Sequence, residues 1–264
     1  MCHSMHPPWK TKGKIMSKLD IVLIPKIMRK NNWINGAKLM EKWFNDPSNS
    51  QPTLGIPSTD IIKMDWILSY PRAKTVYDTL VREKVWENAA AQREIVGMLK
   101  RRNLLSTTSQ QFGFNKFNIP LIDKDAIQFR VVGGYWDMAF GDMDDLRAAL
   151  ARFIFKVVIK GEVSPVPNTS SNSIIRYKVT ISEIGIYARD SYDFNDAPGE
   201  DQELGNWDKD DNSVGRTIFN GGDEIKNSDF RNWRKSHTKG GDFIVYSDIK
   251  TIKLNTPSTF EFNK

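Results

Sequence analysis

The N-terminal half of the chain places hydrophobic side chains every three or four positions, which is the spacing of amphipathic helices. Proline, serine and asparagine interrupt this pattern over residues 45–58, which predicts a loop. The pattern predicts four helices: one from Trp33 with Asn32 as its cap, one beginning after Ser58 or Thr59, one from Pro71, and one over residues 88–102.

After Gly113 hydrophobic and polar residues alternate instead, which is typical of strands with one buried face. The predicted strands cover residues 152–160, 174–187 and 242–254. The hydrophobic phase shifts after Glu183, as a β-bulge would cause. Between the first strands, residues 144–151 favour a short helix with Asp142 as its cap.

Together these patterns predict an α+β protein, in which a helical N-terminal portion precedes a β-rich C-terminal domain. The β-rich part is expected to be an antiparallel or mixed sheet, or an open barrel, with the strand at residues 174–187 in a central position. The predicted division is a disordered lead at residues 1–14, a helical region at 15–117 and a β-rich domain at 118–264.

Composition excludes several classes of protein. Cys2 is the single cysteine, so no disulfide can form within the chain. The longest apolar run near the N-terminus covers only residues 21–24, far below the roughly 20 residues that a membrane helix needs. The early lysines are not followed by the apolar stretch of a signal peptide. We therefore expect synthesis in the cytoplasm, without a signal peptide and without a transmembrane segment.

Charge is unevenly distributed along the chain. Residues 1–130 contain 21 Lys and Arg against 11 Asp and Glu, whereas residues 131–264 contain 17 against 21. A basic half could face nucleic acid, an anionic membrane or an acidic partner. No dense basic block occurs, which favours an ordinary solvated helical surface, and the acidic second half argues against a nucleic-acid groove.

The most suggestive cluster of polar residues is Asp-Ser-Tyr-Asp-Phe-Asn-Asp at residues 190–196, hereafter the acidic segment. It follows a predicted strand directly, and loops at strand ends often carry function. Carboxylates such as Asp190 and Asp193 suit Mg²⁺, and one of them could alternatively act as a general base. The competing interpretation is a solvated acidic turn, because Asp and Asn are common in turns.

Arg231, Arg234 and His237 recur at helical spacing before the last predicted strand. They could present one face to an anionic ligand, although such a trio is more often a solvated helix face. With no cysteine partners nearby, His237 does not suggest a structural zinc site. The sequence also lacks the serine-hydrolase, phosphate-loop and zinc-protease motifs.

The run YARDSYDFN at residues 187–195 resembles the active-site segment of colicin M-like bacteriocins, whose signature is Asp-x-Tyr-Asp followed after five residues by His-Arg. Asp190, Tyr192 and Asp193 match its first part. The positions of the His-Arg pair are Gly199 and Glu200 in this chain, so the second part is missing. The surrounding order of helices, strands and a Gly-acid-aromatic step before the last strand is also similar, over residues 120–255.

This resemblance implies a metal-dependent phosphodiesterase that cleaves the lipid-linked diphosphate of the cell-wall precursor lipid II, in the periplasm of a target cell. Asp190 and Asp193 would then hold Mg²⁺ or water, and Tyr192 would orient the substrate. Either His237 and a nearby arginine would replace the missing pair, or the scaffold has lost or changed its chemistry. Arg231 and Arg234 would contact the diphosphate.

The chain is also similar to an uncharacterised bacterial family encoded near type VI secretion genes, in which the DSYDF and W-R…GGDF…SD segments recur. That resemblance implies delivery by a secretion apparatus. Two functions follow as expectations: an antibacterial effector that hydrolyses lipid II, or a non-catalytic binding or adaptor protein whose partner is the apparatus or an immunity protein. The missing His-Arg pair favours the second, whereas the motif at the end of a predicted strand favours the first, and the sequence leans slightly toward the first.

Overall fold

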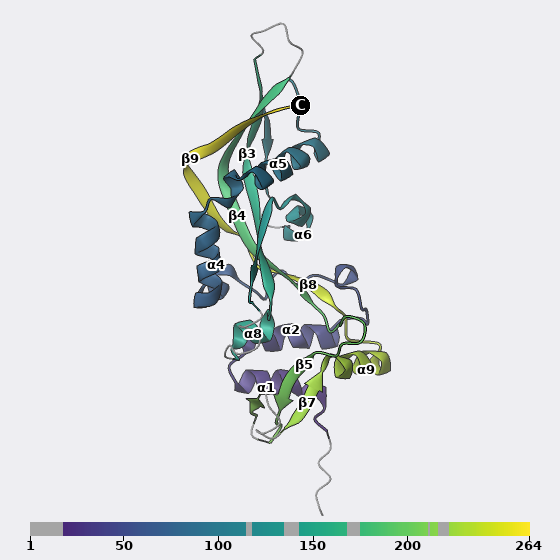
Figure 1. Ribbon diagram of the computed structural model, residues 1–264. Coiled ribbons are helices and arrows are strands. Elements are labelled where there is room, and N and C mark those ends of the chain that lie inside the picture. Colours follow the sequence, from purple (N-terminus) through teal and green to yellow (C-terminus); the bar gives the residue numbers. More distant parts are fainter. Residues whose placement is uncertain (1–17, 115–117, 135–142, 168–174, 211, 216–221) are drawn as a thin grey trace, which may run out of the picture.

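The computed structural model describes residues 18–114, 118–134, 143–167, 175–210, 212–215 and 222–264 (Figure 1). They form an elongated molecule, with a long twisted sheet at one end and a group of helices and short strands at the other. Helices dominate the N-terminal half and antiparallel strands the C-terminal half, which confirms the predicted α+β class. No helix among these residues is long and apolar enough to cross a membrane.

The α-helices of the described residues are α1 (Ile24–Lys30), α2 (Ile34–Asn45), α3 (Met64–Leu68), α4 (Pro71–Arg82), α5 (Ala89–Arg101), α6 (Ile119–Ile122), α8 (Asp145–Ala149) and α9 (Asn227–His237). Local sequence explains their limits. Pro71 occupies the first turn of α4, where its missing N–H costs no hydrogen bond. The Asn88 side chain accepts from the backbone N–H of Ala91 at 2.8 Å and so caps α5.

Two predicted helix starts are wrong. Asn32 does not cap α2, because its φ of 59° places it in the left-handed turn that ends α1, and Trp33 occupies the cap position instead. The second helix begins at Met64, several residues after Ser58. The short helix α8 is capped by the Asp144 side chain, which accepts from Arg147 N at 2.9 Å; the predicted cap, Asp142, lies outside the described residues.

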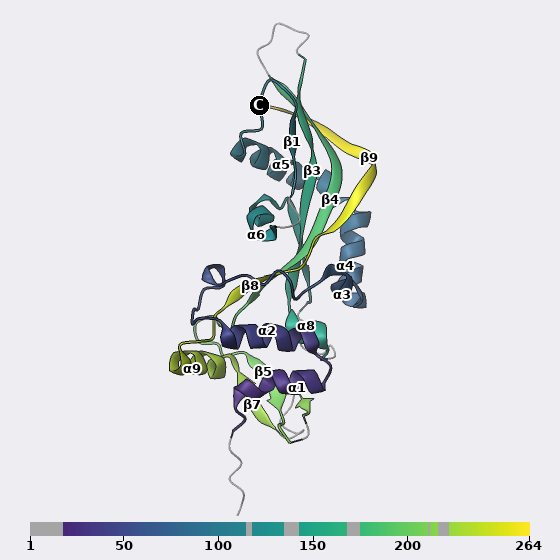
Figure 2. The same cartoon turned by 180° about the vertical axis from the view of Figure 1, so that it is seen from behind.

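The main sheet is antiparallel, and β4 is its central strand, as predicted. Its strands are β1 (Gln110–Phe112), β2 (Gln128–Val132), β3 (Phe153–Val166), β4 (Arg176–Tyr192), β8 (Phe243–Tyr246) and β9 (Lys250–Asn263). β3 pairs with β4 along its whole length and with β1 and β2 on its other side. β8 and β9 share the far side of β4 (Figure 2). The pairing shifts at Ser182, one residue before the predicted bulge.

The predicted strand at residues 242–254 is in fact two strands. Ser247, fully buried, separates β8 from β9. Its hydroxyl accepts from Ala188 N at 2.8 Å and donates to the carbonyl of Asp248 at 2.7 Å. These side-chain bonds interrupt the edge of the sheet, and β9 then resumes pairing with β4 at Lys250.

A second, smaller antiparallel sheet contains β5 (Glu203–Trp207), β6 (Val214–Gly215) and β7 (Asp223–Lys226). None of the strands predicted from the sequence falls in this sheet, so the sheet adds to the prediction. Its anchor is Trp207, which is buried and meets the Trp33 ring edge-on, with ring centroids 6.2 Å apart. A single tryptophan among acidic residues gives no alternating pattern from which to predict a strand.

One continuous hydrophobic cluster joins the N-terminal helices to the main sheet. Tyr77 of α4, for example, meets Phe155 of β3 edge-on at 6.1 Å between ring centroids. A smaller cluster under α6 covers part of the other face, around Val158 and Tyr187. The predicted boundary between a helical region and a separate β-rich domain, at residues 117 and 118, stays a prediction.

Candidate functional site

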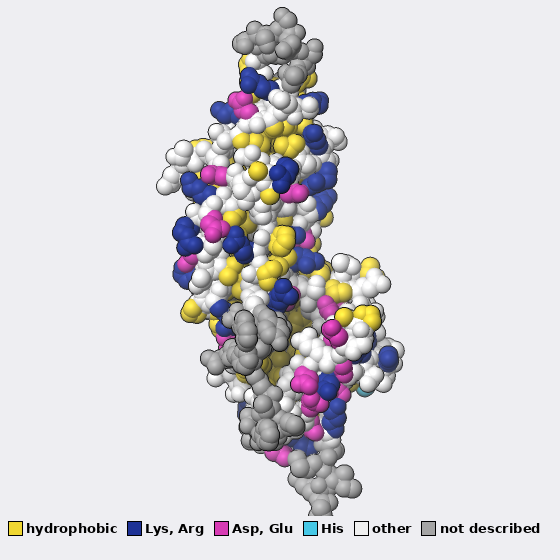
Figure 3. Space-filling view, in the orientation of Figure 1, with side chains coloured by type: hydrophobic (Ala, Val, Ile, Leu, Met, Phe, Trp, Pro, Cys, Tyr) yellow, Lys and Arg dark blue, Asp and Glu magenta, His cyan; other side chains and the backbone are white. Residues whose placement is uncertain are grey.

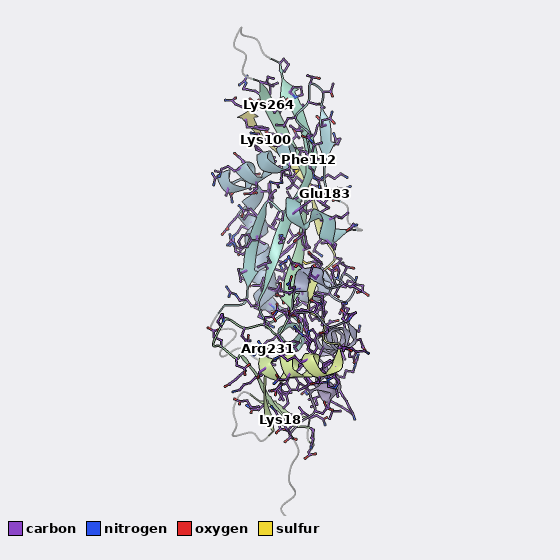
Figure 4. All side chains as sticks on the ribbon, turned by 90° about the vertical axis from the view of Figure 1, so that its right-hand side faces the viewer. Lys18, Lys100, Phe112, Glu183, Arg231 and Lys264 are labelled. Atoms are coloured by element: carbon purple, nitrogen blue, oxygen red, sulfur yellow. The ribbon has the colours of Figure 1, made fainter. Side chains whose placement is uncertain are left out.

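The acidic segment (residues 190–196) does not follow a strand as predicted: residues 190–192 are the last three of β4 (Arg176–Tyr192), and residues 193–196 continue from it, at the end of the molecule that contains α2 and α9 (Figures 1 and 4). Figure 4 labels Arg231 on α9 at this end and Lys264 toward the other. β8 lies beside the last residues of β4, so that Tyr192 pairs with Phe243. The segment is therefore surrounded by elements from the beginning, middle and end of the chain.

Asp242 is the centre of a buried polar cluster at this end. Its carboxylate accepts from Trp43 Nε1 at 2.8 Å, from Asn195 Nδ2 at 3.0 Å and from the guanidinium of Arg234. The side chain is fully buried, and burial raises the pKa of Asp242 against the opposing effects of these donors. We call these four residues the Asp242 cluster. Such a buried charge is tolerated because each carboxylate oxygen has donors.

The backbone before Asp242 explains how the cluster closes around Trp43. Gly240 has a φ of 91°, a conformation that side chains rarely adopt, and a Cβ there would lie 2.6 Å from the Trp43 ring. Glycine therefore allows the chain to pass directly over the indole. The Arg234 guanidinium lies over the same ring, 5.3 Å from its centroid. The Gly-Gly-Asp-Phe run is accordingly a packing feature of this end of the molecule.

Arg231 is engaged by the last residues of the acidic segment and by the loop that follows it. It donates to the carbonyl of Phe194 at 2.9 Å, forms an ion pair with Asp196 and contacts Asp201 at 3.1 Å. Burial alone would raise the pKa of Asp196, but the hydrogen bonds from Arg231 and Asn227 lower it below its usual range. Arg231 thus fastens the loop to α9.

Tyr192 is a core residue. Its ring stacks on Phe243 at 5.1 Å between centroids, and its hydroxyl contacts Met40 Sδ at 3.6 Å inside the protein. Burial raises the pKa of the phenol. Phe194 packs similarly, stacked 3.8 Å from Phe230 of α9. The two aromatic residues of the acidic segment therefore point into the hydrophobic cluster.

Asp190 and Asp193 are the two carboxylates of the segment without an ion pair in the described structure. Asp190 is half-buried and accepts only from Ser191 N, at 2.8 Å; burial raises its pKa to about 8. Asp193 accepts from Asn195 N at 3.0 Å, the hydrogen bond of a local turn. Burial raises the pKa of Asp193 too, against the effects of Asn195 and Arg234.

His237 is exposed and turned toward its own helix. Its ring stacks on Trp233 at 4.3 Å, and Nδ1 lies 2.8 Å from the Trp233 carbonyl. Within the described structure no hydrogen bond joins His237 to Asp193. The residues proposed from the sequence thus lie around one end of the molecule, but Tyr192, His237 and the two aspartates do not form one hydrogen-bonded group.

Metal binding by Asp190 and Asp193 stays a prediction. Among the residues that the structure describes, no group of three or more His, Cys, Asp or Glu side chains is arranged to hold a metal ion. Two carboxylates leave most of the six oxygen ligands of Mg²⁺ to water or substrate. Both carboxyls also have a raised pKa, which favours their protonated forms and weakens their affinity for a cation.

Sequence reasoning missed the partners that decide the roles of the arginines. Asp242 entered only as part of a Gly-acid-aromatic step, and Trp43 was not singled out. Their contact joins residues 199 positions apart, which no local spacing can reveal. The sequence signal that could have pointed to Asp242 is the pair of glycines before it, because glycine often occurs where the backbone passes close to another group.

A model of the family of unknown function DUF6402 matches residues 19–218 and 216–262, so the chain belongs to this family. Searches of the curated proteins and of the solved structures found no match.

Proposed function

We propose that the chain is a non-catalytic binding protein. The observation that carries this proposal is the engagement of Arg234 with Asp242, because Arg234 is one of the two cations that the sequence offers for a diphosphate. Arg234 is buried, and its carboxylate partner is fully buried. Moving the guanidinium to a ligand would leave the Asp242 charge without its partner, which is strongly unfavourable.

The other cation supports the same conclusion. Arg231 is shared by Asp196 and Asp201, which hold the loop against α9. Lys and Arg side chains elsewhere are spread over the surface rather than gathered into one patch on the face seen in Figure 3. A protein partner fits such a surface better than a highly charged small ligand. The resemblance to a family encoded near type VI secretion genes suggests a component of that apparatus, or an immunity protein, as the partner.

Expression in the bacterial periplasm tests this proposal. The chain is sent there behind an added signal peptide, and growth is followed with protein levels confirmed by immunoblot. A non-catalytic binding protein should leave growth unchanged, as should the Asp193→Ala variant. Lysis by the wild type that Asp193→Ala removes would overturn the proposal.

One observation favours a second candidate, the hydrolysis of lipid II by an antibacterial effector. Asp190 is a half-buried carboxyl at the end of a strand, and burial raises its pKa to about 8. A carboxyl that stays protonated near neutral pH can act as a general acid toward a leaving diphosphate. Purified protein with Mg²⁺ and lipid II would then release the polyprenol, and Asp190→Asn would abolish the release. Turnover that Asp190→Asn leaves unchanged would exclude this role for Asp190.

A further inference from the structure

The outer edge of β9 is the longest strand edge in the described structure. β9 contains 14 residues and pairs with β4 on its inner side. Both cartoon views show β9 along the rim of the sheet, with no strand beyond its C-terminal half (Figures 1 and 2). In the described part of the chain, no strand or bridge pairs with the outer side of residues 258–263. Such an edge presents unpaired backbone groups that can pair with another strand.

The first half of β9 carries features that discourage pairing. Lys250 is held by Asp65 at 2.6 Å, and Lys253 is exposed. The pairing with β4 then breaks between Lys253 and Ser258, and this bulge contains Pro257, which has no N–H to donate. Lysine, proline and bulges are the usual means by which proteins protect a strand edge.

The second half, residues 258–263, lacks these features. Its sequence is Ser-Thr-Phe-Glu-Phe-Asn, without lysine, arginine or proline. Phe260 and Phe262 remain half-buried at the margin of the hydrophobic cluster, and Phe262 stacks on Tyr177 at 5.8 Å between ring centroids. The single charge, Glu261, lies on the opposite face, 3.5 Å from Arg176. The contrast between the two halves indicates that the second half is kept open for a partner.

We propose that residues 258–262 of β9 pair in antiparallel fashion with the same residues of a second copy of this chain. A two-fold axis at Phe260 places the partner's Phe260 opposite it, and Glu261 opposite the partner's Thr259. Aromatic pairs of this kind stabilise a sheet. A shift by two residues would place Glu261 opposite the partner's Glu261, and like charges directly opposite are unfavourable. The charge pattern therefore favours the register centred on Phe260 over the one centred on Glu261.

A closed dimer fits this edge better than an open-ended filament of many copies. A two-fold contact uses the same surface on both molecules and closes after two. The opposite edge of the main sheet offers only β1, with three residues, and β2, with five. A head-to-tail filament would need to pair β9 with one of these short strands. The dimer extends the sheet through both molecules and leaves the Asp242 clusters at its two far ends.

Sedimentation equilibrium of the full chain, tagged at the N-terminus, tests the dimer. The expected mass at high concentration is twice the 30.3 kDa of one chain. Thr259 is exposed, so two substitutions there test the register without disturbing the core. Thr259→Glu places a second carboxylate opposite the partner's Glu261, at two symmetric positions, and should raise the dissociation constant about tenfold. Thr259→Lys places a cation there and should lower it.

The matched pair makes the result decisive. Circular dichroism should show the same fold for both variants, since neither contacts the hydrophobic cluster. A wild-type mass of one chain at every concentration would overturn the dimer. A dimer that both variants leave equally strong would overturn the pairing through β9. Neither result bears on the proposed binding function, which does not depend on the number of copies.

Discussion

The two ends of β4 differ in what covers the strand beside them. At one end, Tyr192 and its neighbours pair with β8, and the segment before α3 covers β8 in turn through a bridge between Ser58 and Val245. At the other end, Arg176 and its neighbours pair with β9, and no strand among the described residues pairs with the outer side of its C-terminal half. The closed end holds the buried charges and the acidic segment. The open end holds half-exposed aromatic residues.

This difference indicates that Arg234 and Asp242, the buried ion pair at the closed end, serve the fold. A group that touches solvent on one side can exchange its partner for a ligand at little cost. The Asp242 carboxylate cannot, because burial makes an unpaired charge strongly unfavourable. Contacts with other molecules are therefore expected at the open end, where a partner can bind without displacing an existing contact.

The largest effect is expected from breaking the Asp242 cluster. Asp242→Ala leaves the buried Arg234 without its carboxylate and should lower the free energy of unfolding by about 3–5 kcal/mol. Urea denaturation followed by tryptophan fluorescence measures the change. Asp201→Ala, which removes an exposed partner of Arg231 and Ser228, is the matched control and should have a much smaller effect. Equal effects of the two substitutions would remove the distinction between buried and exposed pairs.

A somewhat smaller effect is expected from Tyr192. Tyr192→Ala creates a cavity beside Phe243 and should cost about 3 kcal/mol of stability, whereas Tyr192→Phe removes only the weak contact of the hydroxyl with Met40 and should cost less than about 1 kcal/mol. Thermal unfolding of both variants gives the comparison. If Tyr192→Phe is the more damaging change, the hydroxyl has a role that packing does not explain.

The buried carboxyl of Asp190 predicts a pH dependence. Its pKa is about 8 in the folded protein and near 4 when unfolded, so between these values the native state holds a proton that the unfolded state has released. Stability therefore falls as pH rises from 4 to 8 and levels off above 8. The Asp190→Asn variant lacks this titrating carboxyl, so the denaturation midpoint of the variant should fall less than that of the wild type over the same pH range. Parallel pH profiles for variant and wild type would show that Asp190 is not desolvated.

The smallest effect on stability is expected at the open end. Thr259→Glu and Thr259→Lys are exposed changes away from the core and should alter the free energy of unfolding of the monomer by no more than about 0.5 kcal/mol. Urea titrations at low protein concentration, where dimers dissociate, provide the value. A large loss in either variant would mean that residue 259 belongs to the core of one chain.

Strong periodic patterns were sufficient to predict the main elements. Pro71 and the buried series that contains Tyr77 and Leu80 predicted α4, and the long alternating runs predicted β3 and β4. The break between β8 and β9 could not be predicted, because it depends on hydrogen bonds from Ser247 to a strand far away in sequence. The small sheet around Trp207 is held by pairing between polar segments, which local composition describes as turns.

The candidate site was harder to predict than the fold. The Asp-x-Tyr-Asp spacing drew attention to the closed end but did not show which way the side chains face. Alternation along β4 places Tyr192 on the same face as the buried Ala188, and this signal was available in the sequence. The ion pair of Arg234 with Asp242 could not be predicted from the sequence, because it depends on how α9 packs against α2 and β8.

The central claim is that the acidic segment is fastened to the fold through the Asp242 cluster, and a double-mutant cycle tests it most directly. Asn195 belongs to the segment and donates to Asp242 at 3.0 Å. Unfolding free energies are measured for the wild type, Asn195→Ala, Asp242→Ala and the double variant. The account predicts a coupling of about 1 kcal/mol, the contribution of a partly buried hydrogen bond to a carboxylate. Additive effects, with no coupling, would contradict it.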